Sequence, residues 1–378
     1  MKSIQQFKRH RKLLIVPVIG VLIVAAVFLS TRPGSGENKL DEAVEGGELT
    51  LTSVGRNYES ITSFLQKDEA QARQLLDAAR LALESARTKL DSAARTDDEY
   101  VHGMLDNYQR LASASDTMSK GVDNLLFVSE NLTNAIDYYS KGDYDKASIE
   151  AAYCLEVLTP LLGEFDTSTS VLNGVNVLYV PSGQKDRLAV RVSQYKNERE
   201  IYKQCILLLQ SLMQGKDYLK QNALLEEYLR QLQEATAKQD YEAAERLRQQ
   251  MSDLLQSLRS SDYQNAADLA SQLDPGKLGD EYSQIAQELQ NRLRNTDELD
   301  AFQNYLLALQ KYLEALQMFS ENPNSTGAIQ QLIDDALSKA GQGAGSGNGE
   351  TQSLYEGLKG ALSQLSTQLY ARRPPPPG

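Results

Sequence analysis

The chain has no tryptophan, and it has only two histidines and two cysteines in 378 residues. His10 lies in a basic N-terminal cluster, so His102 is the sole histidine of the remaining chain. One histidine cannot build a zinc site unaided, and no Cys-x-x-Cys, His-x-x-x-His, phosphate-binding glycine loop or calcium loop occurs. We therefore expect no catalytic, cofactor-binding or metal-binding residues and no enzyme activity.

Aromatic residues other than 19 tyrosines are also sparse, whereas Ala, Leu, Gln, Glu, Ser and Asp dominate. This composition is typical of an all-α protein whose helices carry narrow apolar stripes. The net charge is −12. A field of that sign repels nucleic acid, so we expect no nucleic-acid partner.

Residues 13–31 carry no charge, and five basic residues precede them within residues 1–12. At about 1.5 Å per residue, a helix of this length can cross a hydrocarbon core of about 30 Å. Because basic flanks stay in the cytoplasm, the pattern predicts a single-pass cell-membrane protein with most of the chain extracytoplasmic. A cleaved signal peptide is the alternative; the length of the apolar run favours the uncleaved anchor.

Apolar residues then recur at heptad spacing over long stretches. One row begins at Leu65 and ends at Leu90, with alanines between the leucines, and two rows follow over residues 98–140. The second of these rows is interrupted by Ser115 and Ser129. A continuous helix over residues 98–140 would measure about 60 Å, so the pattern predicts long antiparallel helices in an extended coiled coil or bundle.

Glycine- and proline-rich stretches divide the chain further. The expected segments are a cytoplasmic basic stub (1–12), a transmembrane helix (13–31), a flexible stalk (32–54), a long-helix hairpin plus a third helix (55–165), an extended crossover (166–183), a helical bundle domain (184–340), a Gly-rich linker (341–350), a C-terminal helix (351–371) and a Pro-rich tail (372–378).

One short motif resembles the inter-helix turn of a tetratricopeptide repeat. Its residues are Tyr138, Gly142, Asp143, Tyr144 and Ala147, and the likeness covers residues 131–160 only. Later Asp-Tyr pairs, whose Asp residues are at 217, 240 and 262, recur at 23 and 22 residues, whereas the family repeats at about 34. We therefore expect at most one such hairpin. In these pairs Asp caps a helix start and Tyr packs under the turn.

Two cysteines and two sequons remain. Cys154 and Cys205 could form a disulfide, or each could be a small buried apolar residue at a helix contact. Asn131 and Asn324 head Asn-x-Thr triplets and are candidate N-glycosylation acceptors, of which Asn324 lies in the more loop-like sequence.

The sustained heptads favour a membrane-anchored, extracytoplasmic helical scaffold that binds other envelope proteins or self-associates through helix faces. Two alternatives stay open at this stage. The chain could be an extracytoplasmic ligand-sensing bundle acting through a partner, or a passive structural spacer.

Overall fold

The protein folds almost entirely into helices. The computed structural model describes residues 39–95, 97–343 and 349–371. The α-helices are α2 (Lys39–Leu65), α3 (Glu69–Ala93), α4 (Glu99–Phe127), α5 (Ser129–Ser140), α6 (Tyr144–Leu172), α7 (Lys185–Ala237), α8 (Tyr241–Leu258), α9 (Ser261–Ser271), α10 (Asp280–Arg292), α11 (Thr296–Glu321), α12 (Thr326–Gly343) and α13 (Gly349–Ala371). Three short 3₁₀ turns accompany them: η1 (Val177–Tyr179), η2 (Ser182–Gln184) and η3 (Pro275–Lys277). This part of the chain contains no strand, which confirms the predicted all-α fold.

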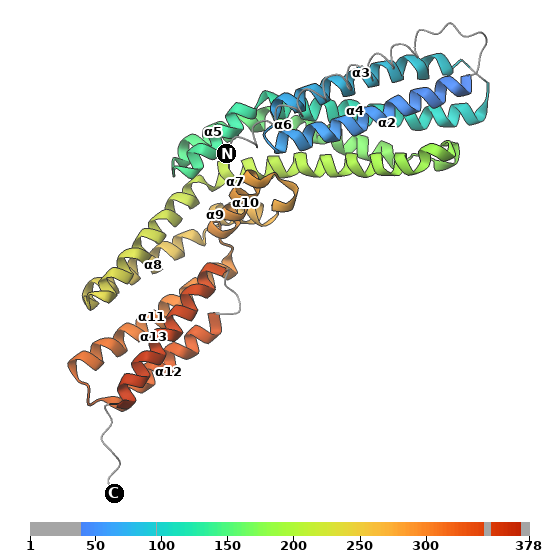
Figure 1. Cartoon of the computed structure of the whole chain (residues 1–378). Helices are drawn as coiled ribbons and strands as arrows, with labels where there is room; N and C mark the ends of the chain where they lie inside the picture. Colours follow the sequence, from blue (N-terminus) through green and yellow to red (C-terminus); the bar gives the residue numbers. More distant parts are fainter. Residues whose placement is uncertain (1–38, 96, 344–348, 372–378) are drawn as a thin grey trace, which may run out of the picture.

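The helices form an elongated assembly, and α7 is the long helix that extends from one region of it into the next (Figure 1). Helices α2, α3, α4 and α6 pack with the first part of α7 as an N-terminal bundle. The rest of α7 leaves that bundle and pairs with α8 and α9, and α11, α12 and α13 form the group farthest from it. With 53 residues, α7 is about 80 Å long, so one continuous helix belongs to both regions.

Small side chains set the packing of the N-terminal bundle. Helix α3 presents alanines to α2 at every seventh position, and all four are fully buried: Ala72, Ala79, Ala86 and Ala93. On α2, Gly46 faces Leu90, and Gly47 faces the ring of Tyr108 on α4. The alanines allow the backbones of α2 and α3 to approach closely, and the two glycines leave room for the side chains of Leu90 and Tyr108.

The residues of the heptad rows are buried as expected except for the half-buried Leu65, but the helix predicted over residues 98–140 is broken. The buried row comprises Met104, Leu111, Met118, Leu125, Leu132 and Tyr139. Helix α4 ends at Phe127 and α5 begins at Ser129, with Val128 between them at φ −96° and ψ 9°. The hydroxyl of Ser129 donates to the carbonyl of Leu126 (3.0 Å). The interruption at Ser129 therefore marks a helix boundary.

Three other predicted boundaries differ from the structure. The stalk over residues 32–54 is helical from Lys39 onward, because α2 packs its small residues into the bundle. The crossover over 166–183 is shorter, since α6 continues through Pro160 to Leu172 before η1 and η2. In the linker over 341–350, α12 extends to Gly343 and α13 begins at Gly349, while residues 344–348 lie outside the description.

Gly215 lies inside α7 and does not end this helix. A Cβ atom at Gly215 would come within 3.0 Å of Leu293, so the glycine admits a neighbouring side chain instead of ending the helix.

No helix in residues 39–95, 97–343 or 349–371 combines the length and the apolar character needed to cross a membrane. Helix α7 is long enough, but charged residues recur along it and its apolar run Cys205–Leu209 is short. This finding contradicts the predicted single-pass membrane localisation, which we do not retain. The segments on which it rested, 1–12 and 13–31, lie outside the described residues, as does the tail 372–378.

Replacement of Gly47 by alanine should destabilise the N-terminal bundle. The new Cβ would lie 2.4 Å from ring atoms of Tyr108, which is itself fully buried. Such overpacking costs about 1–3 kcal/mol of unfolding free energy. The matched control is Gly163→Ala in α6, where a Cβ meets nothing within 4 Å; it should stabilise by about 0.5–1 kcal/mol. Urea unfolding measures both, and equal effects would refute the close-packing account.

Candidate functional site

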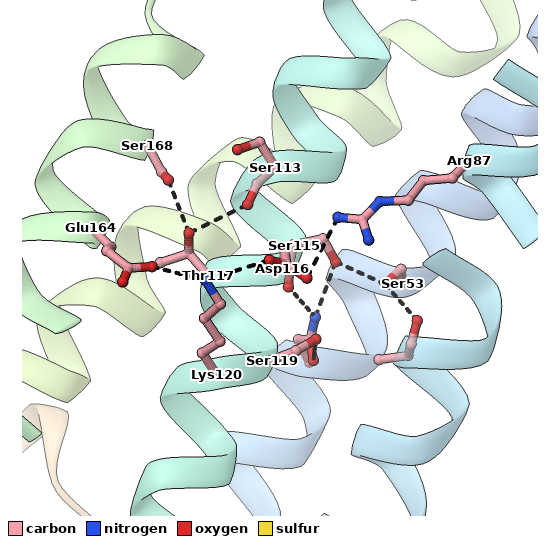
Figure 2. A network of polar contacts seen from close by, with 12 residues as sticks. Ser53, Arg87, Ser113, Ser115, Asp116, Thr117, Ser119, Lys120, Glu164 and Ser168 are labelled. Carbon is pink, nitrogen blue, oxygen red and sulfur yellow. Dashed lines mark hydrogen bonds and ion pairs between the residues drawn. The ribbon is translucent and has the colours of Figure 1, made fainter. Parts of the chain in front are cut away.

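A layer of small polar side chains occupies the centre of the N-terminal bundle (Figure 2). Ser53 and Asn57 come from α2, and Ser115 and Ser119 come from α4. Asn57 Nδ2 donates to the Ser115 carbonyl and hydroxyl (both 3.0 Å), and Ser119 Oγ donates to Asn57 Oδ1 (3.0 Å). Since Ser53 donates to the Ala79 carbonyl (2.7 Å), Ser115 is the donor in the 2.8 Å contact between the two serine hydroxyls.

This layer is structural. Its members are buried, hydrogen-bonded and not titratable, so it fixes the register of α2 and α4 without offering a reactive group. At its edge, Thr117 meets Ser168 of α6 (3.0 Å), and Lys120 pairs with Glu164 of α6 (3.0 Å) (Figure 2).

Glu198 is the one acid of the described chain that is fully buried with both carboxyl oxygens lacking a hydrogen-bond partner among the described residues. It lies on α7 between Tyr195 and Tyr202, three residues before it and four after it, so all three share one face. Both tyrosines donate to α6 carbonyls, Tyr195 to Phe165 (2.8 Å) and Tyr202 to Leu158 (2.9 Å). Burial raises the pKa of Glu198 well above its usual range, so the acid stays protonated inside the bundle.

Glu198→Gln should stabilise the protein at neutral pH. Because the pKa of Glu198 is raised in the folded state, the unfolded chain loses this proton at a lower pH than the folded protein does. The contribution of Glu198 to stability therefore falls as the pH rises from about 4.5 towards the folded pKa. Glutamine is neutral at every pH and should gain about 1–3 kcal/mol at pH 7, with little difference near pH 4. Thermal unfolding across pH 4–8 measures the effect, with exposed Glu156→Gln as the control. A lower melting temperature for Glu198→Gln at pH 7 would contradict this account.

Both cysteines are buried free thiols. Cys154 on α6 and Cys205 on α7 are 0% and 2% exposed. The structure therefore has no bridge between them, and each thiol packs as a small apolar side chain. Burial raises the pKa of each thiol to about 12.

Thiol reagents should accordingly leave Cys154 and Cys205 unmodified in the folded protein and label both in denaturant. A buried, protonated thiol is a poor nucleophile and reacts only when the surrounding helices open. Mass spectrometry after timed iodoacetamide treatment checks this. Complete labelling within minutes under native conditions would show that α6 and α7 separate readily.

The tetratricopeptide-like residues form the turn between α5 and α6. Gly142 has a positive φ of 76°, and the Asp143 side chain accepts from the backbone N–H of Lys146 (3.3 Å). The ring of Tyr144 lies 5.8 Å from that of Tyr139, and Ala147 is buried. The ring of Tyr138 lies 5.2 Å below Lys146 Nζ.

The same turn connects two other helix pairs. Lys67 precedes Asp68 at the α2–α3 turn, and Gln239 precedes Asp240 at the α7–α8 turn; Lys67 and Gln239 have positive φ, and each aspartate caps the next helix. Of the other predicted helix starts, Asp217 lies inside α7, and Asp262 follows the first residue of α9. The motif therefore identifies helical-hairpin turns only where a left-handed residue precedes the aspartate.

The two sequon asparagines differ in accessibility. Asn131 lies in α5, half-buried, and donates to Glu150 (2.7 Å), whereas Asn324 is exposed between α11 and α12. His102 is exposed on α4, and no group of three His, Cys, Asp or Glu side chains within the described ranges could hold a metal ion.

A polar cleft of about 550 Å³ lies where the end of α2, α7 and the η3–α10 segment meet. Lys277 Nζ donates to Asn197 Oδ1 (2.7 Å), and Asn197 Nδ2 donates to Tyr58 Oη (2.7 Å). Lys67 pairs with Glu281. Both lysines of the cleft already have partners. We therefore interpret these contacts as the ones that attach residues 275–281 to the N-terminal bundle.

The strongest candidate is an open groove between α11 and α12, called here the α11–α12 groove, with a volume of about 640 Å³. Met318, Ala328 and Leu332 supply apolar surface, and Glu314, Glu321 and Asp335 supply three carboxylates. The remaining lining residues are Gln317, Asn322, Ser325 and Gln331. No basic residue lines this groove.

A second groove, of about 680 Å³, lies between α8 and α11. It is lined by Tyr241, Glu242, Glu245, Arg246, Gln249, Gln250 and Gln317. Gln317 lines both grooves, so α11 is flanked by open grooves on two sides. Sequence reasoning missed both, although the seven-residue spacing of Glu314 and Glu321 places them on one helix face.

Comparison with protein-family models, with curated proteins and with solved structures gives no match for this chain.

Proposed function

We propose that this protein is a helical scaffold that binds protein partners through the exposed faces of its C-terminal helices. The observation that carries the proposal is the α11–α12 groove, which offers apolar side chains and a carboxylate rim between two helices. Grooves of this kind accept the apolar face of a partner helix, with polar residues at the rim setting its orientation.

In this proposal the N-terminal bundle serves as a rigid arm. Its interior consists of small interlocked side chains and a hydrogen-bonded polar layer, which allow little rearrangement. Helix α7 runs without a break from that bundle to the α8 region, so it would hold the grooves at a fixed distance from the arm.

The ligand-sensing alternative has less support. The polar cleft beside α10 is lined by two lysines, Lys67 and Lys277, and by the acids Asp280 and Glu281. Lys67 pairs with Glu281, and Lys277 binds Asn197. A charged ligand would have to break these contacts before it gained any of its own.

Site-specific photo-crosslinking tests the scaffold proposal. With p-benzoyl-phenylalanine at Gln317, which lines both grooves, irradiation of intact cells should give discrete protein adducts. The same residue at Leu81, which is 54% exposed on α3, is the control and should give none of these adducts. Absence of adducts at Gln317, or the same adducts at both positions, would refute partner binding at the C-terminal helices.

A further inference from the structure

We infer that the α11–α12 groove takes a basic amphipathic helix of a partner protein. This inference rests on the proposed scaffold function and adds the chemistry of the partner. It follows from the shape of the groove and from the sign of its charges.

The groove is built from two helix stripes that face the same space. On α11 the stripe comprises Glu314, Gln317, Met318 and Glu321, and on the α12 side it comprises Ser325, Ala328, Gln331, Leu332 and Asp335. Both follow the three- and four-residue spacing of one helix face; the α11 stripe covers about 10 Å and the α12 stripe about 15 Å. A partner helix placed there would contact both stripes and add a fourth helix to α11, α12 and α13.

The apolar surface of the groove suits a side chain of variable shape. Met318 and Leu332 are half-buried, and Ala328 is exposed. Methionine has three rotatable bonds and a polarisable sulfur, so Met318 can adjust to the leucine or isoleucine of an incoming helix. The apolar stripe of the partner would lie over these three residues.

The charges of the groove select a basic partner. Glu314 and Glu321 lie on one side, Asp335 lies on the other, and no basic residue lines the groove between them. Lys311 pairs with Glu314 (2.8 Å) and so reduces the negative charge that Glu314 adds to the groove. Residues 296–341 as a whole carry seven carboxylates against two lysines. A helix with lysine or arginine on both edges of its apolar stripe would match this pattern, whereas an acidic helix would be repelled.

A fluorescent amphipathic peptide of about 18 residues, built from leucine, alanine and lysine with lysines on both edges of the leucine stripe, is the probe. Titrated with the full chain and followed by anisotropy, it should bind saturably at one site. Asp335→Lys should weaken its binding about tenfold, because a carboxylate that attracts the peptide becomes a charge that repels it. Raising the salt from about 0.05 M to about 0.5 M should weaken it as well.

Asp334→Lys is the matched control. It changes the same charge on the same helix, one residue away, but Asp334 does not line the groove and instead accepts from Gln330 (2.9 Å). The affinity of the Asp334→Lys variant for the peptide should stay close to that of the unaltered chain. Circular dichroism should show equal helix content in the Asp334→Lys and Asp335→Lys variants. Equal weakening by the two substitutions would overturn the inference, since it would indicate only a diffuse acidic field.

Two further outcomes would overturn the inference. A peptide with glutamate in place of lysine could bind equally well. Alternatively, carbodiimide crosslinking could join Glu321 or Asp335 to lysines within residues 1–12, which would make the basic N-terminus of this chain, or of a second copy, the occupant. If adducts form at Gln317 while the basic peptide fails to bind, the partner chemistry is wrong and the scaffold function stands. If both fail, the scaffold function falls too.

Discussion

The close approach of α2 to α3 and α4 is the contact on which the rest of this structure depends. It requires glycine and alanine where the helices touch, and it buries backbone-bonded serines and an asparagine between them. An unpaired amide or hydroxyl in that position would cost free energy, so the polar layer is stable only in the one register in which each member has its partner. The layer therefore specifies how the helices align, while the apolar rows supply most of the burial.

The position of helix α7 depends on that contact, because α7 packs against α2. Its N-terminal end is attached to α2, because Gln184 Nε2 donates to the Val44 carbonyl (3.1 Å) and Arg187 pairs with Glu48. Arg191 then lies over Gly55, where any Cβ would meet its guanidinium. Past these contacts the same helix continues to α8, so the register chosen by small residues of α2 sets the direction of the C-terminal half. This position of α7 also buries Glu198, which stays protonated beside buried tyrosines of the same helix and lowers the stability of the fold at neutral pH.

Much of this architecture was predictable from periodicity, and the failures have definite causes. Buried rows such as Met104 to Tyr139 follow from heptad spacing alone. Ser115 interrupts an apolar row in the sequence. Its partners, Ser53 and Asn57, lie about sixty residues away on α2, of which residues up to 54 were predicted to be a stalk. The role of Gly215 was not predictable either, because its contact, Leu293, is also distant in sequence. The candidate grooves were missed since α11 is leucine-rich on several faces, and only its neighbours decide which face stays open.

The two halves of the molecule differ in the size of the side chains that meet between their helices. Where Gly, Ala and Ser meet in the N-terminal bundle, little space is left between the helices, and each polar atom of the central layer is bonded inside. Where Gln, Glu and Met line α11 and α12, the helices do not close over these long side chains, and grooves remain. Closure of the α11–α12 groove by the chain itself would bring Glu314, Glu321 and Asp335 together and out of water, which like charges resist. A basic helix removes that obstacle by pairing with the carboxylates as it covers them, so the charges that keep the α11–α12 groove open are the same charges that select its partner.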